Sequence, residues 1–278
     1  MGLAEAGAAT EDRAGAVAGG ALLAVDRVTM RFGGVTALEN VSFRVAPGVI
    51  CGLIGPNGAG KTTLFNCISR LYEPHSGAIL FEGRPLAAAA KHEIATLGVA
   101  RTFQNVALFA TMTTRDNVRV GAHALGQAGF LANALGLPRA RAEERRIAER
   151  ADALIEEFRL GAVADRPAGE LPFGVRKRIE LARALAIGPR LLLLDEPAAG
   201  LNHEEVDALS AEIRAIRDRR GVAILLVEHH MNLVMRTSDQ VVALDFGRVI
   251  ADGAPADVRA NPEVVRAYLG GGVKGRNP

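Results

Sequence analysis

The 278-residue sequence contains no tryptophan, only two cysteines, and few aromatic residues of any kind. Two cysteines are too few for a disulfide framework, and no apolar run reaches the roughly 18 residues that a membrane-spanning helix needs. The formal net charge is only +2, with basic and acidic residues mixed, which argues against a protein that coats nucleic acid. These absences predict a reduced α/β protein that reaches a membrane only through a partner.

The most informative segment is a glycine-rich loop between an apolar strand pattern (49–54) and a helical pattern (64–68). Its glycines let backbone N–H groups approach phosphate oxygens, Lys61 adds a positive charge, and the Thr62 hydroxyl can complete the coordination of Mg²⁺. The loop therefore predicts binding of a nucleoside triphosphate. It consists of Gly55, Pro56, Asn57, Gly58, Ala59, Gly60, Lys61, Thr62 and Thr63.

Two further polar segments follow buried strand patterns, where open α/β sheets present their ligand sites. Asp195 and Glu196 follow the apolar run 190–194, and we expect Asp195 to hold Mg²⁺ through its water shell and Glu196 to orient or deprotonate the attacking water. His229 follows the run 222–227 and is placed to contact the terminal phosphate or fix the water. A zinc site is the competing interpretation of the histidines, but no HExxH or paired Cys/His spacing supports it.

The rest of the chain divides by composition. We expect a disordered extension (1–20), one nucleotide-binding domain (21–270) and a flexible tail (271–278). Alternating residues predict a hairpin over 22–45, and a helical, charged region over 88–187 predicts an inserted subdomain, with 126–138 as a segment of unassigned role. A helix is expected over 202–219, capped by Asn202 and Glu205, and a closing hairpin over 240–252 precedes two short helices.

These elements, in this order, resemble the ATP-binding subunits of ABC transporters. The resemblance implies an α/β fold: a P-loop NTPase core with a mixed, mostly parallel sheet, an antiparallel β subdomain and an inserted helical subdomain. It also implies ATP and Mg²⁺ as ligands. The matching positions are Phe32 for the aromatic that stacks on adenine, 55–63 for Walker A, Gln104 for the Q-loop amide near Mg²⁺, Asp195 and Glu196 for Walker B and the catalytic glutamate, 199–202 for the D-loop and His229 for the switch histidine.

The signature stretch departs from the family pattern. Leu171-Pro172-Phe173-Gly174-Val175 stands where LSGGQ is common, so the serine is missing. In the family this motif begins a helix that faces the γ-phosphate held by the opposite subunit, and Pro172 removes a hydroxyl and an N–H that could contact it. Leu171 and Gly174 remain as matching positions, and the helix is expected over 176–186. Either the motif tolerates the change or the composite site is impaired.

Several stretches narrow the resemblance to the LivG-type ATPases of branched-chain amino acid importers: 101–105, 195–202, 228–231 and 267–270. The subclass usually has Pro and Asp where His203 and His230 stand here. The family pattern implies a second ATPase, LivF-like or a second copy of this chain, two membrane permeases, and indirectly a periplasmic binding protein. It places the chain on the cytoplasmic face of the inner membrane. Urea or a short amide is the alternative cargo.

Other protein classes fit less well. A GTPase would carry an Asn-Lys-x-Asp segment, which the sequence lacks. ABC proteins of translation or DNA repair usually carry two ATPase units or long coiled coils, and this chain has one unit. The lipopolysaccharide-export ATPase is a related alternative, against which residues 101–104 and 228–229 argue. A catalytically dead scaffold conflicts with the presence of Lys61, Asp195, Glu196 and His229 together.

Overall fold

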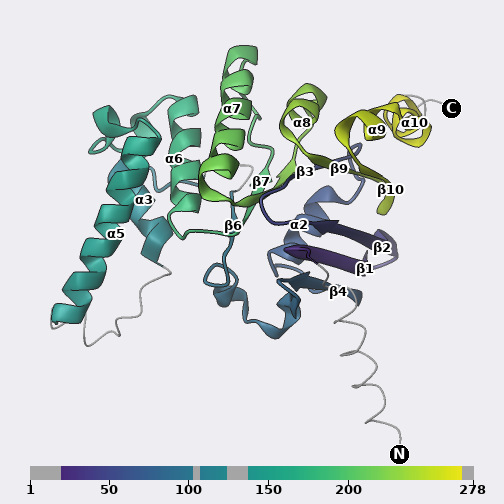
Figure 1. The fold of residues 1–278 in the computed structure, drawn as a ribbon, viewed down its shortest axis with the longest axis horizontal. Coiled ribbons are helices and arrows are strands. Elements are labelled where there is room, and N and C mark those ends of the chain that lie inside the picture. The colour runs from purple at the N-terminus through teal and green to yellow at the C-terminus, as the bar shows by residue number, and fades with distance from the viewer. Residues whose placement is uncertain (1–19, 103–106, 124–136, 271–278) are drawn as a thin grey trace, which may run out of the picture. The chain divides into compact units, whose positions relative to one another are not determined.

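The computed structural model describes residues 20–102, 107–123 and 137–270 (Figure 1). By its internal contacts the chain divides into two compact units, Met1–Ile94 with Val206–Pro278, and Ala95–Glu205. Gln104, the predicted extension before residue 20, the predicted tail 271–278 and nearly all of segment 126–138 lie outside the described residues. The domain boundaries proposed from sequence, including the insertion over 88–187, stay predictions.

The first unit contains an antiparallel sheet in the order β2-β1-β4-β5. The predicted hairpin over 22–45 is present, because the Gly33–Gly34 turn joins β1 to β2 and Gly33 adopts the positive φ of 55° that the turn needs. The strands of this sheet are β1 (Leu23–Phe32), β2 (Val35–Val45), β4 (Ser76–Phe81) and β5 (Arg84–Pro85).

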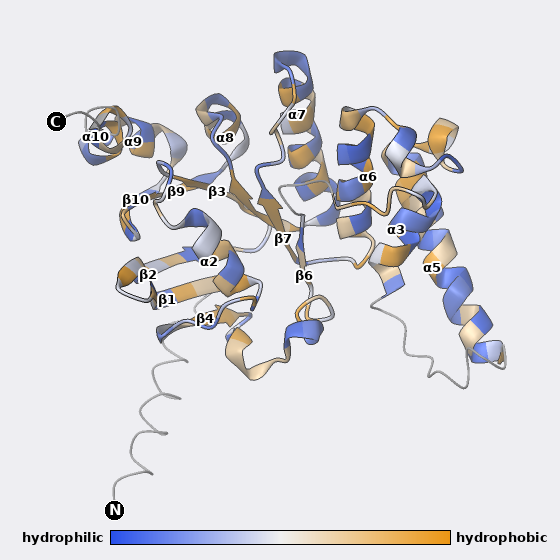
Figure 2. Ribbon diagram, turned by 180° about the vertical axis from the view of Figure 1, so that it is seen from behind, coloured by the Kyte–Doolittle hydropathy of each residue, from blue (hydrophilic) through white to orange (hydrophobic). Residues whose placement is uncertain are grey.

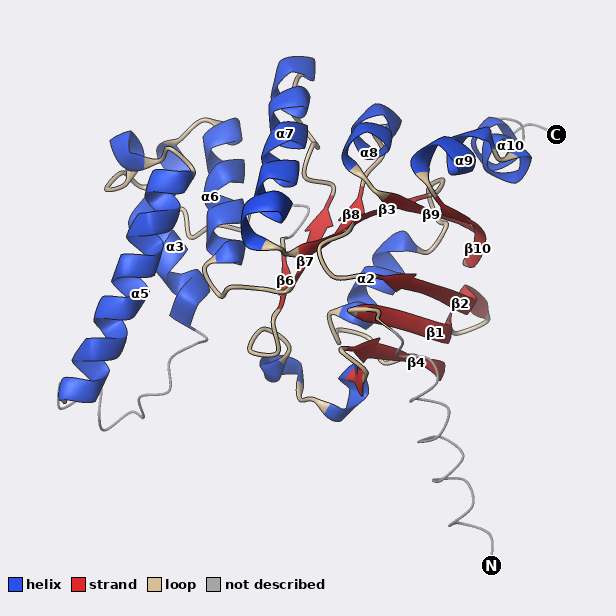
Figure 3. Cartoon of the chain, in the orientation of Figure 1, coloured by secondary structure: helices blue, strands red, loops and turns tan. Residues whose placement is uncertain are grey.

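The same unit contains four strands in the order β10-β9-β3-β8, with β3 parallel to both β8 and β9. Helices α8, α9 and α10 follow these strands on one side of them (Figure 3). Ile54, Val234, Val241, Ala243, Val258 and Val264 form their shared core. The bounds are β3 (Ile50–Ile54), α2 (Lys61–Ile68), β8 (Ala223–Val227), α8 (Met231–Thr237), β9 (Gln240–Asp245), β10 (Arg248–Gly253), α9 (Pro255–Ala260) and α10 (Pro262–Gly270).

The second unit pairs β6 in parallel with β7 and packs α3 against α5 and α6. Strand β7 is buried along its whole length, as its apolar sequence predicts, and is coloured hydrophobic in Figure 2. Helices α3 and α6 approach so closely that a Cβ at Gly121 would lie 2.0 Å from the carbonyl oxygen of Arg183. The bounds are β6 (Val99–Arg101), α3 (Thr114–Ala122), α5 (Pro138–Glu157), α6 (Phe173–Leu185) and β7 (Leu191–Asp195).

The starts of helices α7 and α6 can be compared with the positions predicted from the sequence. Helix α7 (His203–Arg220) has the predicted cap, since the Asn202 N–H donates to Glu205 Oε2 at 2.9 Å and the Glu205 N–H donates to Asn202 Oδ1 at 3.0 Å. Helix α6 begins at Phe173, three residues before the predicted Arg176, and the prediction was wrong there. The cause is Pro172, whose carbonyl oxygen accepts the first helical hydrogen bonds while its missing N–H costs nothing at a helix start.

Short 3₁₀ turns connect the other elements at Leu86–Ala88, Lys91–Glu93, Gly161–Val163 and Ala168–Glu170. In the part of the chain that the structure describes, we find no helix with both the length and the apolar character needed to cross a bilayer.

Candidate nucleotide site

The glycine-rich loop connects β3 to α2 and is folded as a strand-loop-helix unit (Figure 1). Gly55, Gly58 and Gly60 have φ values of 152°, 81° and 101°. A Cβ at Gly55 would lie 2.2 Å from the carbonyl oxygen of Leu244, and one at Gly60 would lie 2.6 Å from that of Ala37. Other residues at these two positions would therefore push the loop out of shape.

Lys61 is the first residue of α2 and is 6% exposed. Its Nζ donates to the carbonyl oxygens of Gly55 at 2.7 Å and Pro56 at 3.0 Å, so the cation is held inside the curve of the loop. The hydroxyl-bearing Thr62 is exposed in the first turn of the helix, where the backbone N–H groups lack helical partners and carry partial positive charge. A buried cation and a helix N-terminus together make this loop an anion cradle.

The C-terminal helix α10 supports this loop. Tyr268 places its Oη 2.8 Å from the N–H of Gly55, which donates to it, although the two residues are 213 positions apart. Burial raises the pKa of the Tyr268 phenol, so the group stays protonated through the neutral pH range. The turn between β9 and β10 adds a second support, because the Gly247 N–H donates to the Ala59 carbonyl oxygen at 3.0 Å. Gly55 and Ala59, the first and fifth residues of the loop, are thus each hydrogen-bonded to a residue outside the loop.

We expect Tyr268→Phe to leave the Gly55 N–H without its acceptor. Loss of a partly buried hydrogen bond costs about 1–3 kcal/mol, which predicts a thermal midpoint lower by roughly 2–8 °C. ATP affinity should also fall several-fold, because Gly55 begins the phosphate loop. Thermal unfolding and calorimetric ATP titration measure both effects. Leu269→Ala, on the exposed side of the same helix, is the matched control. An unchanged midpoint and affinity in Tyr268→Phe would contradict a supporting role for α10.

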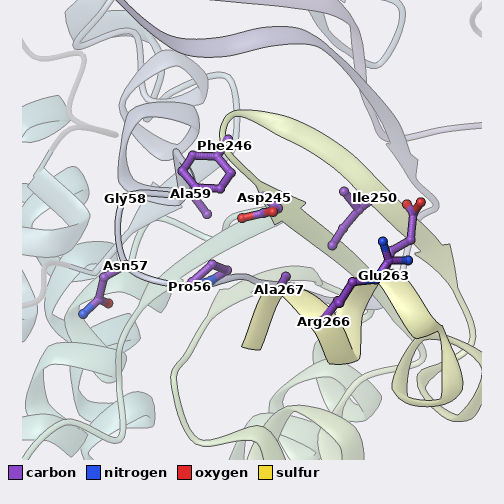
Figure 4. Close-up of a pocket in the computed structure, with 10 residues that line it drawn as sticks. All are labelled: Pro56, Asn57, Gly58, Ala59, Asp245, Phe246, Ile250, Glu263, Arg266 and Ala267. Atoms are coloured by element: carbon purple, nitrogen blue, oxygen red, sulfur yellow. The ribbon is translucent and has the colours of Figure 1, made fainter. Parts of the chain in front are cut away.

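A pocket of about 680 Å³ lies beside the phosphate loop (Figure 4). Its lining carries two carboxylates, Asp245 and Glu263, against one guanidinium, Arg266, and includes no residue of α2. This charge balance disfavours a triphosphate inside the pocket, so the phosphates are still expected at the cradle at the start of α2. The lining residues are Pro56, Asn57, Gly58, Ala59, Asp245, Phe246, Ile250, Glu263, Arg266 and Ala267.

Phe32, at the end of β1, is 43% exposed, and its ring lies edge-on to Tyr72 with centroids 5.3 Å apart. Sequence alone would favour a core role for this phenylalanine, and the structure instead leaves a large part of it accessible. An exposed aromatic pair in the unit that carries the phosphate loop is a surface on which a planar base can stack.

His229 follows β8 in the same unit and is exposed. The turn that presents it is held by Glu228, which is 1% exposed and whose Oε2 accepts the His229 backbone N–H at 3.0 Å. The same oxygen lies 3.3 Å from Nδ1 of His230. Glu228 is a residue whose role sequence reasoning missed; the signal was a carboxylate directly after a fully buried strand.

Asp195 and Glu196 lie together at the end of β7 in the second unit. Asp195 is 6% exposed, and its Oδ2 accepts a hydrogen bond from Arg101 Nη2 at 2.7 Å. Glu196 is half-buried and has a φ of 47°, a conformation that non-glycine residues rarely adopt and that is enriched at functional sites. Arg101 was known from the sequence only as part of a family stretch, and its contact with Asp195 was not foreseen.

The signature stretch is also in the second unit. Leu171 is buried, whereas Phe173 is 37% exposed with the cationic groups of Arg176 and Lys177 each 5.6 Å from its ring centroid. Gly174 lies in the first turn of α6, where a Cβ would come within 3.3 Å of Glu205. Lys177 is buried and its Nζ lies 3.7 Å from Oε2 of the buried Glu180, so its charge is balanced inside the protein. The positive end of α6 therefore consists of the first-turn N–H groups and the Arg176 guanidinium, which favours an anion in front of it.

Both cysteines are free, as expected. Cys51 lies in β3 and Cys67 in α2, and burial raises the pKa of each thiol, for Cys67 to about 11. Neither forms a reactive thiolate near neutral pH, which is what buried packing residues of β3 and α2 would show.

Comparison with known proteins agrees with this geometry. Residues 38–199 match the family model described as ABC transporter, and residues 248–274 match the model described as branched-chain amino acid ATP-binding cassette transporter. The chain is 45% identical to the high-affinity branched-chain amino acid transport ATP-binding protein BraF of Pseudomonas aeruginosa, over 90% of this chain and 98% of that protein. It is 42% identical to LivG of Escherichia coli K12, with the same coverage of each.

Among solved structures, the ADP conformation of MJ1267, an ATP-binding cassette of an ABC transporter, superposes with a TM-score of 0.78. The identity is 30%, and the match covers 90% of this chain and 99% of MJ1267. The lipopolysaccharide export ATP-binding protein LptB of Acidithiobacillus ferridurans is more distant, at 35% identity over 84% of this chain and 90% of LptB.

Fold and phosphate loop together define a P-loop NTPase of the α/β class. The chain belongs to the ABC transporter family as an ATP-hydrolysing, ATP-binding subunit of the LivG type. The predicted fold class, family and ATPase activity are therefore confirmed. The individual roles of the site residues stay predictions.

Proposed function

We propose that this chain hydrolyses ATP to power an importer of branched-chain amino acids. The single observation that carries the proposal is the identity of 42–45% to LivG and BraF over 90% of the chain. The match of residues 248–274 to the C-terminal model named for the same transporters supports it. Urea or short-amide uptake is the alternative cargo. Lipopolysaccharide export is less well supported, because the identity to LptB is only 35%.

In this proposal the first unit holds the nucleotide. Phe32 stacks on adenine, and the N–H groups of residues 55–63 together with Lys61 bind the phosphates. Lys61 must exchange its carbonyl partners in the loop for phosphate oxygens, which is a local change of side chain. His229 contacts the terminal phosphate, presented by the turn that Glu228 holds.

The exposed hydroxyl of Thr62 and the carboxylate of Asp195 are each oxygen donors of the kind that Mg²⁺ prefers, with Asp195 acting through the water shell of the ion. Thr62, Asp195 and Gln104 would hold it; Gln104 is outside the described residues. When bound, the ion neutralises charge that develops on the phosphates. Glu196 accepts the proton of the attacking water, and its constrained backbone keeps the carboxylate at the end of β7.

The N-terminus of α6, with Gly174 and the Arg176 guanidinium, would complete the site of an opposing ATPase, either LivF-like or a second copy of this chain. The missing serine is compatible with this role, because α6 still forms directly after Pro172. Tolerance of the proline is the interpretation we favour over an impaired composite site. Two membrane permeases would receive the motion on the cytoplasmic face of the inner membrane, and a periplasmic binding protein would deliver the cargo.

We expect the purified chain alone to hydrolyse ATP slowly, since each site lacks the opposing helix that completes its charge stabilisation. Co-purification with the partner ATPase and permeases should raise turnover at least about tenfold, and proteoliposomes with the binding protein should accumulate leucine in an ATP-dependent way. A phosphate-release assay and radiolabelled uptake measure these. Rapid turnover by dilute single chains, unchanged on adding the partner, would contradict the paired mechanism. ATP-driven uptake of urea but not leucine would reassign the cargo.

A further inference from the structure

The ion pair between Arg101 and Asp195 has no role in the mechanism derived so far. Both residues end parallel strands, β6 and β7, with Arg101 aligned to Leu193. Asp195 lies two positions further along β7 and so on the same face as Leu193, within reach of Arg101. The distance between Arg101 Nη2 and Asp195 Oδ2 is 2.7 Å, and the side chains are only 10% and 7% exposed.

Further hydrogen bonds tie the backbone at the ends of β6 and β7 together beside this pair. The Thr102 N–H donates to the Leu193 carbonyl oxygen at 2.9 Å, and the Asp195 N–H lies 3.4 Å from Thr102 Oγ1. The two strand ends that carry Arg101 and Asp195 are therefore joined next to the pair, and the pair itself is buried and not a contact between surface side chains. Since it is nearly removed from water, its attraction is weakly screened.

The charge balance of the pair determines how readily Asp195 can accept a second cation. A carboxylate with so little water around it needs a compensating cation, and removal of one partner of a buried pair is strongly unfavourable. In the protein without a bound ion, Arg101 supplies such a cation. A divalent ion that approaches Asp195 brings a second compensating charge, and the two cations repel each other across one carboxylate.

We propose that Arg101 is a positioning residue that competes with Mg²⁺ for Asp195 and thereby sets how much Mg²⁺ the nucleotide complex needs. The proposal rests on the proposed role of Asp195 towards Mg²⁺. With the nucleotide bound and no divalent ion, Arg101 holds the carboxylate. When the ion arrives, the guanidinium gives up part of its contact with Oδ2.

The test is a Mg²⁺ titration of the full chain saturated with a non-hydrolysable ATP analogue, followed by thermal midpoint and by calorimetry. Arg101→Gln should move the midpoint of the titration to a Mg²⁺ concentration about tenfold lower, because the carboxylate then has no guanidinium to give up when the ion binds. Binding of the analogue in EDTA should be unchanged. In a chain that already carries Asp195→Asn, the further substitution Arg101→Gln should leave the Mg²⁺ midpoint where Asp195→Asn alone has it.

Arg190→Gln is the matched control, because Arg190 precedes the same strand and donates to the Leu97 carbonyl oxygen at an exposed site. It should leave the Mg²⁺ midpoint where the wild type has it. An unchanged or higher Mg²⁺ midpoint in Arg101→Gln overturns the proposal. If Asp195→Asn alone leaves the Mg²⁺ midpoint where the wild type has it, the proposed role of Asp195 fails. If Asp195→Asn raises that midpoint but Arg101→Gln does not lower it, only the role of Arg101 fails.

A second measurement needs no destabilising variant. In the wild-type chain with the analogue in EDTA, the guanidinium NMR signals of Arg101 should show the hindered rotation of a held ion pair. Adding Mg²⁺ should broaden or shift them, while the Arg190 signals stay constant. Arg101→Lys, which keeps the charge, serves to assign the resonances. Arg101 signals that do not respond to Mg²⁺ overturn the proposal.

Discussion

Glu196→Gln should lower ATP hydrolysis at least about a hundredfold while ATP binding persists. The glutamine has the same shape and suits the same backbone conformation with φ of 47°, but its amide cannot accept a proton from water. Since Asp195 and Arg101 are unchanged, the nucleotide site keeps its other charges. Phosphate release measures the turnover, and calorimetry measures the retained binding.

The same variant should accumulate an ATP-bound dimer, with itself or with the partner ATPase, because hydrolysis is the step that separates the subunits. Size-exclusion chromatography with ATP detects it. Glu204→Gln, on an exposed carboxylate in the first turn of α7, is the matched control and should hydrolyse ATP like the wild type. Persistent hydrolysis by Glu196→Gln would show that another group accepts the proton.

Lys61→Ala should weaken ATP binding by about a hundredfold, since the loss of charge-assisted hydrogen bonds costs about 1.5–3 kcal/mol or more at a buried site. The ammonium is 6% exposed and lies inside the loop, within reach of whatever the loop binds. Calorimetric titration of ATP measures the affinity, and thermal unfolding establishes that the variant folds.

Lys91→Ala removes the same charge from an exposed 3₁₀ turn and is the matched control. It should bind ATP as the wild type does, which separates a specific contact from a change in overall charge. A folded Lys61→Ala chain that binds ATP with undiminished affinity would show that the cradle does not depend on this cation.

The features that the sequence predicted correctly are those that depend on residues close together in the chain. The strand-loop-helix around residues 55–63 follows from glycine spacing, and the Asn202–Glu205 cap follows from a spacing of three residues. The hairpins at Gly33–Gly34 and Phe246–Gly247 follow from turn residues between alternating strands. The start of α6 was misjudged by three residues because Pro172 was treated only as a loss of donors, whereas its carbonyl oxygen accepts the first helical hydrogen bonds from Val175 and Arg176.

The contacts that could not be predicted join residues that are distant in the chain. Arg101 and Asp195 are 94 positions apart, and Gly55 and Tyr268 are 213 apart. No periodicity or spacing connects such pairs, and only the register of parallel strands or the docking of a helix brings them together. Glu228 was predictable in part. Its place directly after a buried strand can be read from the sequence, but its inward orientation depends on the turn after β8.

The measurement that tests the central claim most directly is a calorimetric titration of Mg²⁺-ATP into the pure wild-type chain, repeated with Lys61→Ala. The account predicts saturable binding of one nucleotide per chain through the cradle at the start of α2, lost or weakened about a hundredfold in the variant. A wild-type chain that releases no binding heat across a range of temperatures, or a variant that binds equally well, would contradict it.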